Sequence, residues 1–477
     1  MHGNDFIALL PLLIVAGTSI VVMLAVAVHR RHARSASLTF IGLAAAFASL
    51  WIAAPVVPLQ VTPLLILDRY ALFYIGLILA ASMACVLLSY GYFEKCEGDH
   101  DELYILLLVA TLGSSVLVAS SHFVSLFLGL ELLSVALYGM ISYRHSLPLP
   151  VEAGIKYLVL AAASAAFLLF GMALVYGALG TMQFGEIAVR LTRAGFDRWL
   201  VLPGMALIVT GFGFKLAVAP FHLWTPDVYQ GAPVPVTAFI ATVSKGAMFA
   251  VLLRYFYRSG AHNLAPVFLV FSIIAIASMF AGNILALLQN NVKRILAYSS
   301  IAHLGYLLVA FQAGSDLGPT AVTFYLVAYF VTTLGAFGVI AVLSDGSKDA
   351  DDMEDYRGLF WRRPALAAVF TAMLLSLAGI PVTAGFIGKF YILAAGASSA
   401  MWALIVIMVI TSAIGLFYYL RIVVVMYGHS AESSAPSSGL APAGGVVLAL
   451  LTAFLLWFGV FPGPLLSAIS TALAGLV

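Results

Sequence analysis

Residues 211–224 of this chain read Gly-Phe-Gly-Phe-Lys-Leu-Ala-Val-Ala-Pro-Phe-His-Leu-Trp. Lys215 and Pro220 interrupt a run that is otherwise largely apolar. A proline inside a helix removes one backbone hydrogen bond and clashes with the preceding turn. In a bilayer such a break is tolerated where other protein groups or a water-lined cavity satisfy the freed backbone groups. The stretch therefore predicts a broken membrane helix beside a polar interior.

The composition of the whole chain agrees with a membrane location. Of its 477 residues, 63% are hydrophobic and 9% are charged, whereas a soluble domain carries roughly 25% charged residues. A soluble fold and a disordered chain are both excluded. The net charge of +2 argues against nucleic acid as a partner. Two cysteines are too few for a disulfide scaffold or an iron–sulfur cluster. What remains is an all-α polytopic protein that has the lipid bilayer around it.

Apolar runs long enough to cross a bilayer recur along the chain. A crossing needs roughly 20 apolar helical residues, and we count about fourteen such runs, joined by short loops. Residues 180–198 between two of them are expected to form a short amphipathic surface helix. The crossings are expected to start near Phe6, Leu38, Ala71, Leu103, Phe123, Ala153, Leu200, Val236, Pro266, Ile295, Thr320, Pro364, Met401 and Gly444.

A second interrupted run lies in the other half of the chain. Residues 377–390 contain Pro381 and several glycines, and Lys389 follows them. A matched pair of broken helices, one in each half, points to inverted repeats around a central path, although two ordinary proline kinks would give the same pattern. The expected division is three N-terminal helices over 1–102, a first five-helix repeat (spans 4–8) over 103–258, a second (spans 9–13) over 264–428, and a C-terminal helix over 429–477.

The basic residues predict the orientation of the chain. If the N-terminus is outside, the inner loops hold twelve of the 22 lysines and arginines and the outer loops hold six. This excess favours an outer N-terminus, and an even number of crossings then places the C-terminus outside as well. The four remaining basic residues fall inside the apolar runs. They are Lys156, Lys215, Lys245 and Lys389.

Ionisable residues inside apolar runs are the candidate functional groups. A charge at the bilayer centre costs at least ~2.5 kcal/mol and by default marks an ion or proton path. Lysine can lose its proton when buried, whereas arginine does not. Glu131 is the acidic residue expected in mid-span. Glu152 precedes Lys156 by four residues, so these two can pair near a helix start. Lys156 could equally extend to the membrane surface without any other role.

Two histidines add to this set. His222 lies in the first broken run, and His303 lies in a later run that also contains Ser299, Ser300 and Tyr306. A neutral imidazole can pass a proton between its two nitrogens near neutral pH. The alternative for each is a plain hydrogen bond between helices. Relay roles are favoured because both lie in segments with other polar residues.

Four stretches resemble the antiporter-like subunits of respiratory complex I. They are residues 215–235, 241–245, 292–306 and 385–391, which contain Lys-Leu-Ala-Val-Ala-Pro-Phe-His-Leu-Trp, Ala-Thr-Val-Ser-Lys, the segment around His303, and Gly-Phe-Ile-Gly-Lys-Phe-Tyr. That family shares its module with multi-subunit cation/proton antiporters and membrane-bound hydrogenases. The resemblance extends over nearly the whole chain. It implies fourteen helices, with spans 4–8 and 9–13 as inverted repeats.

The resemblance also implies roles for individual residues. Glu131 would face a neighbouring subunit and pair with Lys215. Lys245 would connect this pair to the centre, and Lys389 would be the terminal proton site. The implied proton path consists of Glu131, Lys215, Lys245, Lys389, His222 and His303, with Glu152 and Lys156 as further candidates.

The implied function is proton translocation as one subunit of an NADH–quinone oxidoreductase in a bacterial inner membrane. NADH, FMN, iron–sulfur clusters and quinone would bind to partner subunits, and this chain is expected to hold no cofactor or metal. The expected partners are a sister antiporter-like subunit and small membrane subunits. The alternatives are a subunit of a sodium/proton antiporter or membrane-bound hydrogenase, a membrane scaffold without transport, and a stand-alone secondary transporter.

Overall fold

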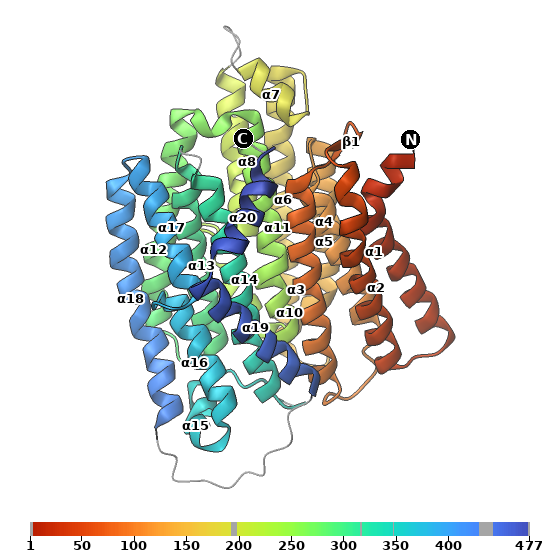
Figure 1. Cartoon of the computed structure of the whole chain (residues 1–477), viewed down its shortest axis with the longest axis vertical. Coiled ribbons are helices and arrows are strands. Elements are labelled where there is room, and N and C mark those ends of the chain that lie inside the picture. The colour runs from red at the N-terminus through yellow and green to blue at the C-terminus, as the bar shows by residue number, and fades with distance from the viewer. Residues whose placement is uncertain (1–2, 192–197, 315–316, 347, 429–441, 476–477) are drawn as a thin grey trace.

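The computed structural model describes residues 3–191, 198–314, 317–346, 348–428 and 442–475. Helices dominate it and stand side by side, mostly along the long dimension of the molecule (Figure 1). The longer helices are α1 (Gly3–Val28), α2 (His32–Ala53), α3 (Arg69–Phe93), α4 (Glu102–Val118), α5 (Phe123–Ile141), α6 (Pro148–Leu179), α8 (Arg198–Leu216), α11 (Lys245–Ser259), α12 (Ala265–Leu287), α13 (Val292–Gln312), α14 (Leu317–Leu343), α16 (Pro364–Ala378), α17 (Ala384–Ser398), α18 (Trp402–Tyr427), α19 (Pro442–Val460) and α20 (Gly463–Leu473).

Short elements connect these helices. One antiparallel hairpin of two strands follows α2. The short elements are η1 (Ala54–Val56), β1 (Leu59–Thr62), β2 (Leu65–Leu67), α7 (Phe184–Leu191), α9 (Trp224–Gly231), α10 (Val234–Phe239), η2 (Ile240–Ser244), η3 (Ala261–Asn263), η4 (Met353–Tyr356) and α15 (Leu359–Arg362).

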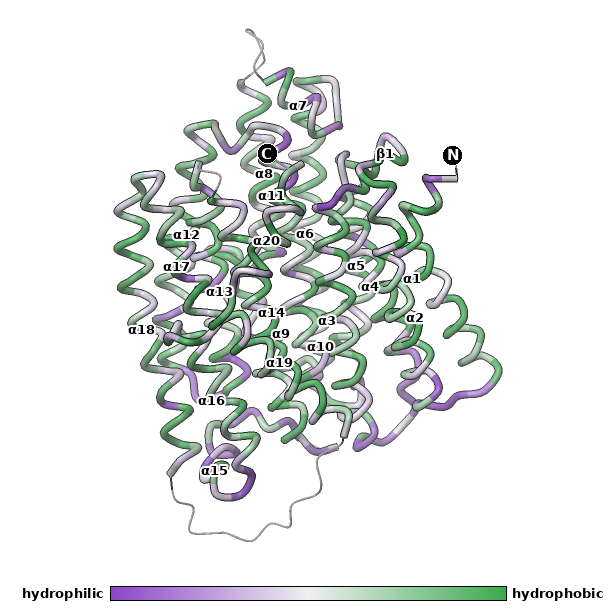
Figure 2. Tube along the Cα trace, viewed as in Figure 1, coloured by the Kyte–Doolittle hydropathy of each residue, from purple (hydrophilic) through white to green (hydrophobic). Residues whose placement is uncertain are grey.

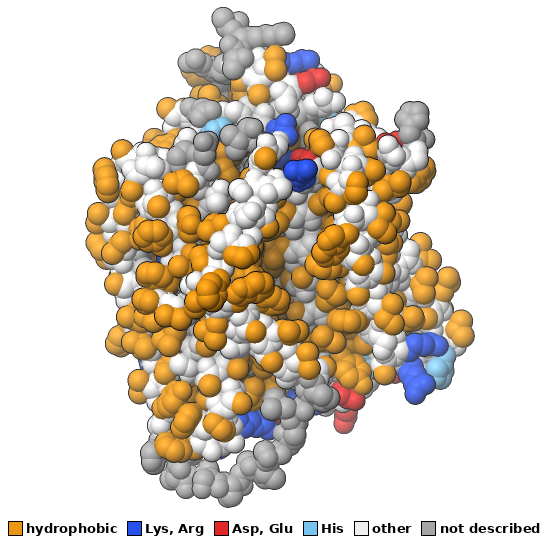
Figure 3. Space-filling view, viewed as in Figure 1, with side chains coloured by type: hydrophobic (Ala, Val, Ile, Leu, Met, Phe, Trp, Pro, Cys, Tyr) orange, Lys and Arg blue, Asp and Glu red, His pale blue; other side chains and the backbone are white. Residues whose placement is uncertain are grey.

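The predicted all-α polytopic class is confirmed. Twelve helices of the described chain are long and apolar enough to cross a membrane. Two further predicted crossings are the 17-residue helix α4 and the pair α16 and α17, which the predicted break divides. Hydrophobic residues line the middle of the trace and polar ones gather at its two ends (Figure 2). Apolar side chains cover most of the face seen in Figure 3, as a lipid-facing surface requires.

The two ends of the bundle carry features that the sequence placed only approximately. The expected surface helix over 180–198 is α7, in which Arg190 and Glu186 form an ion pair of 3.6 Å; residues 192–197 lie outside the described residues. The C-terminal apolar run forms two helices, α19 and α20. They are separated by a short break at Phe461 and Pro462, and Pro464 lies in the first turn of α20. Of the C-terminal segment predicted over 429–477, residues 429–441 and 476–477 lie outside the described chain.

The first predicted break is confirmed around Pro220. Helix α8 ends at Leu216, and α9 begins only at Trp224. Two backbone groups freed by the break find side-chain partners: the indole nitrogen of Trp224 donates to the Phe214 carbonyl at 2.9 Å, and Ser278 on α12 accepts from the Ala219 amide at 2.9 Å. The break is therefore held by neighbouring protein groups, as a break in lipid requires.

The second predicted break is confirmed around Pro381. Helix α16 ends at Ala378 and α17 begins at Ala384. Gly379 adopts a φ of +88°, a left-handed conformation that glycine adopts without steric cost. The start of α17 packs directly on the end of α16, because a Cβ added to Gly385 would lie 1.9 Å from the Ser376 carbonyl oxygen. The arrangement of the two halves as inverted repeats stays a prediction.

The interior of the molecule is formed by three crossings. Within the windows that mark them as membrane spans, α10 to α11 is wholly buried, and α13 and α14 are 89% buried. The first of these crossings has a π-helical segment, η2, directly before Lys245. Such segments inside helices are often found at functional sites. The buried polar residues predicted above lie on and around these three crossings.

Candidate functional site

Lys215 lies in the last turn of α8 and is 6% exposed. Its ammonium donates to the Ser134 hydroxyl on α5 at 2.6 Å and to the Tyr157 hydroxyl on α6 at 3.5 Å. The amine also lies 5.2 Å from the centre of the Tyr157 ring. The side chain thus joins α8 to two neighbouring helices inside the bundle.

Among the described residues, Glu131 and Lys215 form no direct ion pair, and their pairing stays a prediction. Glu131 is half-buried on α5, and its Oε1 atom has no hydrogen-bond partner. Ser134, one turn further along α5, takes the lysine instead. The carboxylate and the amine interact through space, with the serine hydroxyl as the group in contact with the lysine.

Lys245 lies at the start of α11 and is 1% exposed. Its ammonium donates to the Ser300 hydroxyl on α13 at 2.6 Å. Ser300 also accepts a hydrogen bond of 2.7 Å from the Tyr329 hydroxyl on α14. The ring centre of Tyr229 on α9 lies 5.2 Å from the amine. Lys245 therefore occupies the contact region of the three interior crossings.

His303 continues this arrangement along α13. It lies one turn beyond Ser300, is 3% exposed, and contacts the Tyr325 hydroxyl through Nδ1 and the Tyr419 hydroxyl through Nε2, the latter at 3.0 Å. The Tyr419 hydroxyl contacts Ser299 as well. A ring with hydroxyl partners at both nitrogens can accept a proton on one side and release one on the other.

Lys389 lies on α17, just beyond the second break, and is 7% exposed. Its ammonium donates to the Ala378 carbonyl at 2.8 Å and to the Ser412 hydroxyl on α18 at 2.8 Å. Ala378 is the last residue of α16, so the amine binds the negative end of that helix. The break therefore creates the binding site for this lysine.

Three lysines share one local environment. Each amine donates to a serine hydroxyl and lies 5.2–5.4 Å from the centre of a tyrosine ring. Among the described residues, none of the three forms an ion pair with a carboxylate. A buried ammonium without a counter-charge is costly, whereas a neutral amine is much less so. The three sets are Lys215 with Ser134 and Tyr157, Lys245 with Ser300 and Tyr229, and Lys389 with Ser412 and Tyr306.

His222 lies in the first break and is 8% exposed. Among the described residues, no group meets the ring nitrogens of His222 or the hydroxyls of Thr225 and Tyr229 at normal hydrogen-bond geometry. The Pro220 backbone lies near His222, and the Ser300 hydroxyl lies near that of Tyr229. Thr225 and Tyr229 are four positions apart on α9, so they share one face of that helix, and His222 lies just before its start. Buried polar groups without a protein partner require ordered water. Ordered water can therefore bind at these three groups.

Lys156 and Glu152 lie away from this interior set. Lys156 is 43% exposed on α6 and pairs with Glu152 at 2.7 Å, as the spacing predicted, and with Asp227 at 2.8 Å. Asp227 also receives Arg294 at 2.8 Å. The structure thus places the two further candidates in an exposed ion-pair cluster.

The sequence did not predict two buried ion pairs that the described residues form. Lys293 is fully buried and contacts Asp349 at 2.7 Å, and Arg254 is 1% exposed and contacts Asp68 at 2.8 Å. Both basic residues are among the eighteen that the charge count assigns to inner or outer loops. Their partners lie 56 and 186 positions away, so no local pattern marks either pair. A clue for Arg254 was its place inside a run that began near Val236.

A family model covers the part of the chain that contains these residues. The membrane family described as NADH:quinone oxidoreductase/Mrp antiporter, TM, matches residues 120–415. That range contains Glu131, Lys215, Lys245 and Lys389 together with both histidines of the site.

Two relatives match over nearly their whole length. NADH-quinone oxidoreductase subunit N of Ectopseudomonas mendocina (strain ymp) is 50% identical, with 98% of this chain and 97% of the relative covered. Subunit N of Nitrosospira multiformis is 53% identical, with 99% and 97% covered. Both bear out the predicted resemblance to complex I.

Solved structures agree as well. A chain of respiratory complex I from Thermus thermophilus, solved with bound aureothin, is 34% identical, with a TM-score of 0.83 over 97% of this chain and 99% of that one. A chain of the Mrp complex from Dietzia sp. DQ12-45-1b shares the fold, with a TM-score of 0.86 at 20% identity over 100% and 98% of the two chains. The chain belongs to the NADH:quinone oxidoreductase/Mrp antiporter membrane family.

Proposed function

We propose that this chain is a proton-translocating membrane subunit of an NADH–quinone oxidoreductase. The observation that carries the proposal is the set of three buried lysines, none of which has a carboxylate partner within the described part of the chain. A lysine in such a site can exist in both protonation states, which a proton path needs. The identity of 50–53% to two N subunits supports the same function.

Protons would move between Lys215, Lys245 and Lys389. The charge of Glu131 favours the protonated form of Lys215, and its removal or neutralisation favours release of that proton toward Lys245. Ordered water at His222, Thr225 and Tyr229 would connect the first two lysines. His303 with its hydroxyl partners would connect Lys245 to the side of Lys389. Glu152 and Lys156 would lie outside this path.

The energy for translocation would come from partner subunits. NADH, FMN, iron–sulfur clusters and quinone would bind there, so this chain would respond to their chemistry through electrostatic and conformational change. Its expected neighbours are a sister antiporter-like subunit, which Glu131 would face, and small membrane subunits. The complex I chain of similar fold supports an assembly of this kind.

The chain is a multi-pass membrane protein, and we propose a bacterial inner membrane with both termini on the outer side. The excess of basic residues in the opposite loops supports this orientation. The start of α1 and the end of α20 lie toward the same end of the bundle (Figure 1), as an even number of crossings requires. The two matched breaks support repeats over 103–258 and 264–428, with three helices before and a C-terminal segment after.

Replacing Lys215 by Met tests the proposal, because methionine keeps the volume and removes the titratable amine. In inside-out membrane vesicles, NADH-driven acidification reported by a pH-sensitive dye should be lost, while the amount of assembled complex stays at the wild-type level. Lys348, which is 59% exposed, provides the control: Lys348→Met should pump normally. Full pumping by Lys215→Met would refute the proton path.

The family also contains Mrp antiporters, so a sodium/proton antiporter subunit is the second candidate function. The two functions differ in their need for sodium. A redox-driven proton pump acidifies vesicles equally in sodium-free and sodium-containing buffer. Acidification that depends on a sodium gradient, and not on NADH, would favour the antiporter.

A further inference from the structure

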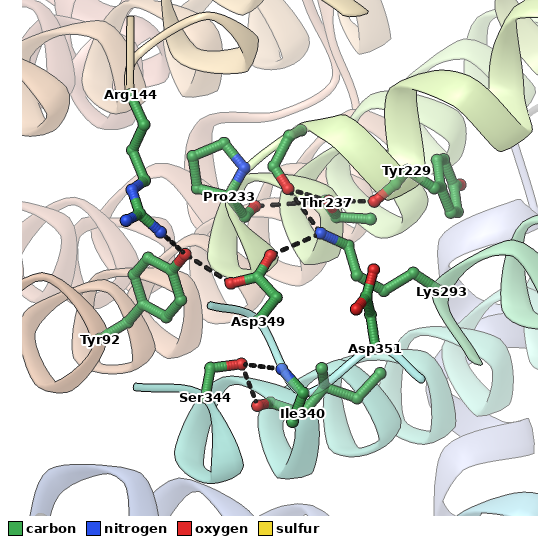
Figure 4. Close-up of polar contacts among 12 residues, drawn as sticks. Tyr92, Arg144, Tyr229, Pro233, Thr237, Lys293, Ile340, Ser344, Asp349 and Asp351 are labelled. Atoms are coloured by element: carbon green, nitrogen blue, oxygen red, sulfur yellow. Dashed lines mark hydrogen bonds and ion pairs between the residues drawn. The ribbon is translucent and has the colours of Figure 1, made fainter. Parts of the chain in front are cut away.

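Lys293 is a fourth buried lysine, and it is outside the proposed path described above. It is the second residue of α13 and has no exposed surface. Its ammonium donates to the Asp349 carboxylate at 2.7 Å and to the Ala232 carbonyl at 2.8 Å (Figure 4). Unlike the other three buried lysines it therefore has a counter-charge, and it lies at the end of the interior bundle rather than in its middle.

On one side of Lys293, a series of hydrogen-bonded side chains connects it to a cavity. Asp349 accepts a hydrogen bond of 2.6 Å from the Tyr92 hydroxyl, which accepts one of 3.0 Å from Arg144 (Figure 4). Arg144 also donates to the Gly346 carbonyl at 2.7 Å. Arg144 and Gly346 line a cavity of about 1140 Å³ whose wall carries further charged residues. We call this space the polar cavity.

The wall of the polar cavity contains several titratable groups. They include Glu97, Asp99, His100, Glu102 and Asp345. His100 is 8% exposed, and its Nδ1 atom has no hydrogen-bond partner, so water in the cavity can bind there. The cavity lies on the side whose loops carry the excess of basic residues, which is the inner side in the proposed orientation.

On its other side Lys293 leads toward Lys245. Ser300 is seven residues further along α13, so the two residues lie on the same face with their Cα atoms about 10.5 Å apart. Ser300 accepts the Lys245 ammonium at 2.6 Å. The Tyr229 hydroxyl is buried near Ser300 and has no partner at normal hydrogen-bond geometry among the described residues. The ring of the same tyrosine lies 5.2 Å from the Lys245 amine. About three water molecules, spaced by hydrogen bonds of about 2.8 Å, would be enough to bridge a distance of this size.

We propose that Lys293 and Asp349 form the entry site through which protons pass from the polar cavity to Lys245. The inference rests on the proposed function. In each cycle the Lys293 ammonium gives one proton through bridging water to a neutral Lys245 amine, which leaves Lys293 neutral. Asp349 then receives the proton of the Tyr92 hydroxyl and passes it to Lys293. Water that enters from the cavity beside Arg144 gives one proton back to the Tyr92 oxygen, and Arg144 stays protonated throughout. The ion pair is restored, and one proton has moved.

A purely structural pair would instead fasten the segment after α14 to α13. The chain contains a lysine with that simpler arrangement. Lys95 is on the wall of the same cavity and donates to the carbonyls of Val342 at 3.1 Å and Ser344 at 2.8 Å, but in the described structure it has no link to Lys245. Lys95 is therefore the matched control.

Lys293→Arg separates the two readings. Arginine keeps the charge and the bond to Asp349, but its higher pKa makes its neutral form roughly 100-fold or more rarer than that of lysine. In the intact complex we expect normal assembly and an initial rate of NADH-driven proton pumping that falls by about tenfold or more. Lys95→Arg should pump at the wild-type rate. A wild-type pumping rate in Lys293→Arg overturns the proposal.

A second variant covers the case in which arginine does not fit. Lys293→Met combined with Asp349→Asn removes both charges, so no unpaired buried charge is left. Loss of pumping in this assembled variant supports the entry site, and normal pumping overturns it. Lys245→Met is measured alongside. If Lys245→Met pumps fully, the proposed function fails; if it is inactive while the Lys293 variants pump normally, only the entry site fails.

Discussion

The ion pair of Arg254 with Asp68 should stabilise the assembled protein without taking part in translocation. Arg254 binds both carboxylate oxygens of Asp68 at 2.8 Å and donates to the Val118 carbonyl at 3.1 Å. Its guanidinium lies 4.7 Å from the centre of the Tyr70 ring. The pair thus ties α11 to the start of α3 and the end of α4 at the outer end of the proposed orientation.

Arg254→Met leaves the Asp68 carboxylate buried without a counter-charge, since its side chain is 8% exposed. Breaking a buried pair in this way costs about 3–5 kcal/mol. In Arg254→Met with Asp68→Asn no such charge remains, and the asparagine oxygen can still accept from the Ala71 amide that Asp68 caps at 2.8 Å. The double variant should therefore be about 2 kcal/mol more stable than the single one.

The assay is the half-life of NADH–quinone reductase activity in detergent at a fixed elevated temperature. The free energy lost in the single variant should lower the barrier to inactivation. The single variant should then lose activity at a rate roughly tenfold higher than wild type or more, and the double variant should recover much of this difference. The complex that survives should pump the wild-type number of protons per NADH. That ratio separates a role in stability from a role in the path.

The pH dependence of the stabilisation by this ion pair follows from the protonation of the Asp68 carboxyl. Burial alone raises the pKa of its carboxyl, but the charge and hydrogen bonds of Arg254 outweigh this and hold the pKa below its usual range. The stabilisation is then complete above the unfolded pKa of about 3.9 and is lost only as the pH falls through the lowered pKa. The gap between wild type and double variant should stay constant from about pH 6 to 8. A single variant as durable as wild type, or a double variant no better than the single, would refute this reasoning.

Three further predictions concern packing, relay and surface charge. Gly282→Ala places a Cβ 2.5 Å from a backbone nitrogen of α13, so it should destabilise the complex by about 1–3 kcal/mol and lower its yield, whereas Gly177→Ala, which meets nothing within 4 Å, should not. Tyr419→Phe removes the hydroxyl 3.0 Å from His303 and should slow dye-reported pumping while native-gel assembly stays normal; unchanged pumping would exclude this contact from the relay. Lys156 is 43% exposed, and Lys156→Ala removes its ion pairs with Glu152 and Asp227. The free energy of unfolding should fall by less than about 1 kcal/mol, as measured by thermal denaturation. A larger loss would contradict the surface location of this lysine.

The sequence predicted those features that depend on local pattern. Hydropathy marked the crossings, and proline with glycine marked both breaks, because these residues disturb a helix wherever they occur. The rarity of charge in apolar runs identified Lys215, Lys245 and Lys389 as buried groups. These inferences need no knowledge of which helices are neighbours.

The features that the sequence did not predict depend on packing between segments that are distant in the sequence. Ser134, rather than Glu131, accepts the Lys215 amine because of how α5 packs in the bundle, and no spacing rule reveals that. Lys293 looked like a loop residue because Arg294 and a polar stretch surround it. Its burial follows from Asp349, which a later segment brings against the start of α13.

The shared serine and tyrosine surroundings of the three central lysines have an energetic consequence. Sites built alike bind a proton with similar free energy, so transfer from one to the next is nearly reversible. Under that condition a bias of about 1.4 kcal/mol already changes the occupancy ratio of two neighbouring sites tenfold. Redox steps elsewhere in an assembly release far more than this. Little of their output is therefore lost in moving charge across this chain, and most of it can be stored as an electrochemical gradient.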